Sequence, residues 1–178
     1  MNNNVLSLER VGKTIKMLTL HIIRHAKTHQ QSESGKDKDR ALLEKGIAQS
    51  NLLGNYLQSH HIELGKMLCS SAKRTRQTKS IICQHLAEQC CVEYRDSLYM
   101  ASKTDLLAEL VSETDPIVTI IGHNDGLSDL ASYCADEYIG LGTCEFITLT
   151  FPFEDWSHIV KGTGTILLRY RPEVFLPL

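Results

Sequence analysis

Residues 18–28, LTLHIIRHAKT, are the stretch that decides how the remaining sequence is interpreted. The first six positions contain the aliphatic residues of a buried β-strand, namely Leu18, Leu20, Ile22 and Ile23. The strand then ends on a cation and an imidazole, Arg24 and His25. Because ligands of open α/β sheets bind just beyond the carboxyl ends of the strands, this ending predicts a functional site. A pair of solvated basic residues is the plain alternative, and the stretch alone does not separate the two.

Three histidines in this region have a spacing that also occurs in metal sites. His21, His25 and His29 stand at i, i+4 and i+8, which would place them on one face of a helix. The surrounding residues favour a strand instead, and in a strand this register is lost. We therefore predict no metal site here.

The composition is that of a single globular domain. The 178 residues are 42% hydrophobic and 22% charged, and the formal net charge at pH 7 is -2. These values are ordinary for a soluble domain, and the small net charge predicts no general binding to nucleic acid or to an anionic membrane. An anionic ligand would have to be held by local cations.

The sequence also indicates a compartment. The N-terminal residues lack the apolar core of a signal peptide, and no apolar run reaches the length of a membrane span. The six cysteines include no C-x-x-C pair, so we expect buried thiols in a reducing cytoplasm. Residues 1–16 precede the domain as a polar extension, for which a disordered arm, a short helix and an artefact of start-site choice stay open. Residues 17–178 are expected to form one domain of undetermined oligomeric state.

Strands and helices alternate along the chain, which predicts an α/β fold. The expected strands lie in residues 18–28, 67–70, 91–94, 117–121, 144–151 and 163–170, and the expected helices in 47–58, 70–86, 105–112 and 127–134. Such alternation predicts a three-layer α/β/α sandwich with a mostly parallel central sheet. Because residues 117–121 are apolar throughout, this strand is expected at the centre of the sheet and parallel to its neighbours.

A second predicted strand end also carries cations. Residues 67–70 run into Ser70 and Ser71, which are candidates for the N-cap of the following helix. That helix start would bring free backbone N–H groups and Arg74, with Arg76 further along, towards one point. An ordinary capped helix with exposed arginines is the alternative.

The third such end follows residues 117–121, where the chain continues with Gly122, His123 and Asn124. If the strands are parallel, all three ends lie at one edge of the sheet. Two guanidinium groups and two imidazoles would then surround one point. Guanidinium groups match the paired oxygens of phosphate or carboxylate, and two cations with a helix N-terminus favour a phosphate dianion.

Five motifs in a fixed order now carry a family resemblance. They are Arg24-His25-Ala26, Asp39-Arg40-x-Leu42-x-x-x-Gly46, Ser70-Ser71-x-x-Arg74-x-x-Gln77-Thr78, Leu98-Tyr99 and Gly122-His123-Asn124. The set resembles the histidine phosphatase superfamily, whose fold is phosphoglycerate mutase-like. The short spacing without inserts is most similar to its small bacterial phosphohistidine phosphatase branch, the SixA type. The match spans residues 18–151.

The resemblance implies a role for each residue of the constellation. His25 would be the nucleophile and form a covalent phosphohistidine intermediate that water hydrolyses. The catalytic groups beside it would be Arg24, Arg74 and His123, and the substrate-binding groups Arg24, Arg74, His123, Asn124 and Arg40. Whether Arg40 or Lys27 contacts the substrate stays open. The resemblance implies neither metal nor cofactor, and its partner would be a histidine-phosphorylated protein such as a phosphotransfer domain in a signalling relay.

One departure from the superfamily bears on the substrate. Mutases and acid phosphatases of the superfamily use an acidic residue to protonate an alkoxide leaving group, and the corresponding residues 95–102 contain no glutamate. Glu93 and Asp96 are imperfect substitutes. An imidazole leaves far more easily than an alkoxide, so the missing acid favours a phosphohistidine substrate.

Three other functions are alternatives to this one. A general phosphomonoesterase or mutase-like enzyme acting on small phosphate esters would use Asp96 as its acid. A non-catalytic phosphate-binding module would keep the pocket without turnover. A cysteine-dependent phosphatase needs five residues between its thiolate and its arginine, whereas four separate Cys69 from Arg74 and six separate it from Arg76.

Overall fold

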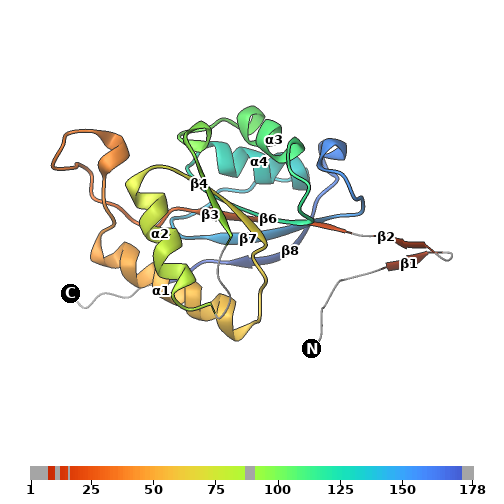
Figure 1. Cartoon of the computed structure of the whole chain (residues 1–178), viewed down its shortest axis with the longest axis horizontal. Helices are drawn as coiled ribbons and strands as arrows, with labels where there is room; N and C mark the ends of the chain where they lie inside the picture. The colour runs from red at the N-terminus through yellow and green to blue at the C-terminus, as the bar shows by residue number, and fades with distance from the viewer. Residues whose placement is uncertain (1–7, 11–12, 16, 87–90, 174–178) are drawn as a thin grey trace.

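The computed structural model describes residues 8–10, 13–15, 17–86 and 91–173. Strands β1 (Leu8–Arg10) and β2 (Lys13–Ile15) pair antiparallel and form a two-stranded sheet of their own (Figure 1). The described part of the N-terminal extension is therefore extended backbone and not the short helix that its sequence left open. The rest of residues 1–16 lies outside the described residues.

The domain is built on a six-stranded sheet in the order β5-β4-β6-β3-β7-β8. The strands are β3 (Leu18–Arg24), β4 (Lys66–Ser70), β5 (Val92–Arg95), β6 (Ile117–Gly122), β7 (Phe146–Phe151) and β8 (Thr165–Tyr170). The first four strands of this order are parallel, while β7 runs antiparallel to β3 and β8 antiparallel to β7. Strand β6 lies between β3 and β4, so the expected central, parallel position of the apolar run 117–121 is confirmed.

Helices cover both faces of this sheet (Figure 1). Helices α1 (Glu44–Ser59) and α2 (Lys73–Cys83) pack together on one face, and α3 (Lys103–Val111) and α4 (Gly126–Ala135) on the other. Three short 3-10 helices, η1 (Asp37–Asp39), η2 (Asp96–Leu98) and η3 (Trp156–His158), lie in the connections. The predicted α/β/α architecture is confirmed. None of the helices in the described part of the chain is both long and apolar enough to cross a membrane.

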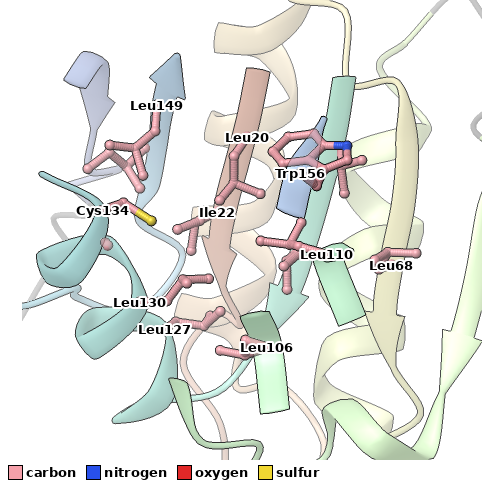
Figure 2. Close-up of a cluster of buried hydrophobic side chains, with 14 of the residues drawn as sticks. Leu20, Ile22, Leu68, Leu106, Leu110, Leu127, Leu130, Cys134, Leu149 and Trp156 are labelled. Carbon is pink, nitrogen blue, oxygen red and sulfur yellow. The ribbon is translucent and has the colours of Figure 1, made fainter. Parts of the chain in front are cut away.

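Alternation along β3 divides the core between the two faces. Leu20 and Ile22 join the cluster under α3 and α4 (Figure 2), whereas Ile23 belongs to the cluster under α1 and α2. Trp156, from the connection between β7 and β8, is buried in the first cluster and donates its indole N–H to the Asp115 carbonyl at 2.9 Å. Because both faces of β3 are buried, its register is fixed, and the position at which it delivers Arg24 is fixed with it.

The beginning of α2 differs from the prediction. The N-cap of this helix is Ala72, without a side-chain cap, so neither of the preceding serines is the cap. Ser71 donates its hydroxyl to the Asp96 carboxylate, and Ser70 is directed towards a histidine of the site described below. The helix ends at Cys83, three residues before the predicted end at residue 86.

Candidate active site

The carboxyl ends of the central parallel strands meet in one pocket. Arg24 of β3 is the register partner of Gly122 of β6, which places the residues that follow, His25 and His123, side by side with ring centroids 5.3 Å apart. Arg74, near the start of the helix that follows β4, reaches the same place. The pocket encloses about 480 Å³, and its lining includes Arg24, His25, Arg40, Arg74, His123 and Asn124. The predicted convergence of Arg24, His25, Arg74 and His123 is therefore present in the structure, and Arg40 and Asn124 line the same pocket.

The hydrogen bonding of His25 fixes its tautomer. Its Nδ1 lies 2.8 Å from the Ala26 carbonyl oxygen, and because a carbonyl only accepts, Nδ1 carries the proton. The lone pair is therefore on Nε2, which has no hydrogen-bond partner among the described residues and faces the pocket. Burial, together with the cationic Arg74 and Arg24, lowers the pKa of His25 to about 4. The imidazole is thus neutral near pH 7, which is the form that can attack an electrophile.

Arg74 is the most deeply buried cation of the pocket, with 1% of its side chain exposed. Its Nε donates to Nδ1 of His123 at 3.3 Å. Its terminal nitrogens donate to Asp37, to the backbone oxygen at 2.7 Å and to Oδ2 at 2.9 Å. The guanidinium plane is therefore held between a histidine of the site and the loop that carries η1.

His123 is neutral with the opposite tautomer from His25. Because its Nδ1 accepts from Arg74, its proton is on Nε2, which donates to the Ser70 hydroxyl oxygen at 2.9 Å. Burial and the neighbouring Arg74 lower the pKa of His123 to about 3. Ser70, which the sequence suggested as a helix cap, orients this ring instead.

Arg24 carries an unsatisfied donor. Its Nη1 donates to the Leu141 carbonyl at 2.7 Å, and the same oxygen accepts from Nδ2 of Asn124 at 3.0 Å. Its Nε is the one buried side-chain nitrogen or oxygen without a partner in the described part of the chain. A buried N–H group without an acceptor raises the free energy of the folded state. The unpaired Nε therefore indicates a place where a bound anion would accept its hydrogen bond.

A residue that the sequence analysis missed, Asp37, holds two of the arginines that line the pocket, Arg74 and Arg40. Its Oδ2 accepts from the Tyr99 hydroxyl at 2.7 Å as well as from Arg74, and its Oδ1 accepts from Nε of Arg40 at 2.7 Å. The hydrogen bond from Tyr99 and the adjacent guanidinium groups lower the pKa of Asp37 to about 2. The only sequence signal for this residue was its position two places before the Asp39-Arg40 motif.

The two carboxylates that the sequence offered as candidate general acids, Asp96 and Glu93, lie outside the pocket. Asp96 is bound to Nζ of Lys38 at 2.6 Å with its side chain 80% exposed, and Glu93 pairs with Arg95 and Lys66. Neither lines the pocket. Among the described residues, no group of three or more histidine, cysteine or carboxylate side chains is arranged to hold a metal ion.

Comparison with known families places this site in context. The model of the histidine phosphatase superfamily (branch 1) matches residues 20–99, which include Arg24, His25 and Arg74. The chain belongs to the histidine phosphatase superfamily. The family match ends before His123 and Asn124, whose membership of the pocket therefore rests on the structure.

The chain is also similar to an individual bacterial sequence and to solved structures. A protein of Mycobacterium tuberculosis (strain CDC 1551 / Oshkosh) is 31% identical over 111 residues, covering 61% of this chain and 67% of the relative. The structure of the protein histidine phosphatase SixA complexed with tungstate has a TM-score of 0.74 at 21% identity, covering 86% of this chain and 97% of the other. Mycobacterial glucosyl-3-phosphoglycerate phosphatase has a TM-score of 0.59 at 16% identity, with coverage of 85% and 98%. At these identities the two structures establish the shared fold.

Proposed function

We propose that this protein is a phosphohistidine phosphatase that removes phosphoryl groups from histidine-phosphorylated proteins. The observation that carries the proposal is the state of His25. A neutral imidazole with its Nδ1 proton held by the Ala26 carbonyl presents the Nε2 lone pair to a pocket lined by guanidinium groups. That arrangement combines a nucleophile with the charges that would hold the phosphoryl group it attacks.

The reaction would proceed in two transfers. In the first, Nε2 of His25 forms a bond to phosphorus while the bond between phosphorus and the substrate imidazole breaks. With its other ring nitrogen protonated, the substrate ring takes the electron pair and leaves as neutral imidazole. In the second, water attacks the phosphohistidine, which releases inorganic phosphate and restores His25. Phosphoryl transfer depends mainly on positioning and charge stabilisation, which here would come from Arg24 and Arg74.

His123 would serve this reaction in one of two ways. In the present arrangement its Nδ1 accepts from Arg74, so the ring holds that guanidinium in place. To bind a phosphoryl oxygen directly, its Nε2–H group would have to exchange the Ser70 hydroxyl for that oxygen. The first contribution depends on the neutral form that burial enforces, because a protonated Nδ1 could not accept from Arg74.

The lining of the pocket supports a phosphorus–nitrogen substrate. None of its described residues is a carboxylate. Asp96, the acid that a general phosphomonoesterase would need, is bound to Lys38 outside the pocket. Asp37 lies beside the pocket, but with its pKa lowered to about 2 it has no proton to give near pH 7. A departing imidazole requires less protonation than an alkoxide, so a site without an acid suits phosphohistidine.

The test is phosphate release from a histidine-phosphorylated protein in the presence of EDTA. We expect EDTA-insensitive release by the wild type, loss of release in His25→Ala, and retained release in His60→Ala, whose exposed ring lies at the end of α1. Failure to act on the phosphoprotein together with hydrolysis of p-nitrophenyl phosphate would instead support a small-ester phosphatase. Inactivity on both substrates would support a phosphate-binding module.

A further inference from the structure

A second hollow adjoins the catalytic pocket. It encloses about 620 Å³ between η1, the first turns of α2 and strand β5. Lys38 comes from η1, Lys73, Arg76 and Gln77 come from α2, and Tyr94 comes from β5. These five residues define what we call the η1–α2 groove.

Two cations of the groove form no ion pair within the described part of the chain. Lys73 and Arg76 are exposed and form no ion pair with any other described residue. The guanidinium carbon of Arg76 lies 4.4 Å from the ring centre of Tyr94, and Nζ of Lys79 lies 5.9 Å from the same centre. Tyr94 thus presents a flat, 40% exposed surface beside the charges. In a chain of formal net charge -2, this is a local surplus of positive charge.

The groove and the catalytic pocket share a wall. Asp37, the first residue of η1, binds Arg74 of the pocket, while Lys38, the next residue, lines the groove. Helix α2 contributes to both sides in the same way, since Arg74 is buried in the pocket and Lys73 is exposed in the groove. A protein whose phosphohistidine enters the pocket would therefore place neighbouring residues over the groove.

We propose that the η1–α2 groove docks an acidic surface of the histidine-phosphorylated protein substrate. This inference rests on the proposed function and adds a feature of the partner, namely carboxylates next to the phosphohistidine. Charge complementarity of this kind steers association and selects partners. The substrate protein is favoured over a nucleic acid because the groove shares η1 and α2 with the pocket that the phosphohistidine enters, and a nucleic acid is an outcome of the binding test below.

The kinetic test compares a protein substrate with a small one. We expect Lys73→Glu and Arg76→Glu each to lower kcat/KM for a phosphohistidine protein about tenfold more than kcat/KM for free phosphohistidine. The control for charge is Lys161→Glu, an equal charge change at an exposed residue that pairs with Asp136 and precedes β8, at the edge of the sheet opposite β5. Raising NaCl from about 50 mM to about 300 mM should weaken the wild type on the phosphoprotein and have less effect on the Lys73→Glu/Arg76→Glu double variant.

A binding measurement separates this proposal from the proposed function. A fluorescein-labelled peptide of alternating glutamate and glycine should bind the wild type and Lys161→Glu at low salt and should bind the double variant at least tenfold more weakly. If the peptide binds in this way but the wild type does not hydrolyse the phosphoprotein, the proposed phosphohistidine phosphatase activity is wrong, whereas the proposal that the groove binds an acidic surface is supported. If the double variant binds the peptide like the wild type, or if an oligonucleotide of equal charge binds more tightly than the peptide, the docking proposal is wrong.

Discussion

Acidification should leave the His25 nucleophile competent well below the pH at which an ordinary imidazole is protonated. Burial and the charges of Arg74, Arg24 and Arg40 lower the pKa of His25 to about 4. With that pKa about 97% of the ring is neutral at pH 5.5, against about 9% for a pKa of 6.5. Between pH 7 and pH 5.5 the neutral fraction should therefore fall by only a few per cent, whereas an ordinary histidine would lose about eightfold.

Histidine-ring NMR over about pH 3.5 to about pH 8 measures this directly, and His25→Gln assigns the resonance. We expect a midpoint near pH 4. In Arg24→Gln the midpoint should rise, because one cation that opposes the imidazolium is removed. A wild-type midpoint near 6.5 would refute the reasoning, since burial and the guanidinium groups would then have no net effect on the proton affinity of the ring.

Three further predictions concern stability, each measured by urea unfolding. Burial lowers the pKa of His21 to about 4, so between pH 6.5 and pH 4 this residue binds a proton in the unfolded state but not in the folded state. The wild type should therefore lose free energy of unfolding as the pH falls from 7 to 5, and His21→Gln should lose about 2 kcal/mol less over the same range. Gly46→Ala should cost about 2 kcal/mol or more, because its Cβ would lie 2.1 Å from the Lys27 carbonyl oxygen. Asp37→Asn should lower the free energy of unfolding by about 1 kcal/mol at pH 7, because it removes the carboxylate that pairs with buried Arg74. The expected loss is modest because the Asp37 side chain is half exposed and solvent screens the pair. An unchanged free energy of unfolding would contradict a stabilising role for this pair.

Much of the fold was predictable because it depends on local patterns. The aliphatic run of β3 and the wholly apolar run of β6 identify two buried strands, and the alternation with helices implies that they are parallel. Once they are parallel and in register, the residues after them must be neighbours. His25 and His123 therefore came together as predicted, although 98 positions separate them in the sequence.

The predictions failed for polar side chains whose hydrogen-bond partners lie far away in the sequence. A serine before a helix usually caps it, and the local sequence around Ser70 offers no reason to expect otherwise. Its hydroxyl instead accepts from His123, because the pairing of β4 with β6 brings the two residues together. Asp37 stands in a polar loop without periodicity, so nothing local distinguished it from its charged neighbours before its contact with Arg74 was known.

The sequence by itself determined the strand and helix order, the edge of the sheet that carries the site, and the identities of its imidazoles and guanidinium groups. These follow from hydrophobic periodicity and from residues covalently attached to strand ends. Only the tertiary structure decided the tautomers of His25 and His123, the orphaned Nε of Arg24 and the neighbouring η1–α2 groove. Burial and hydrogen-bond partners are properties of segments distant in sequence, so proton positions and pKa values appear only when those segments have packed together.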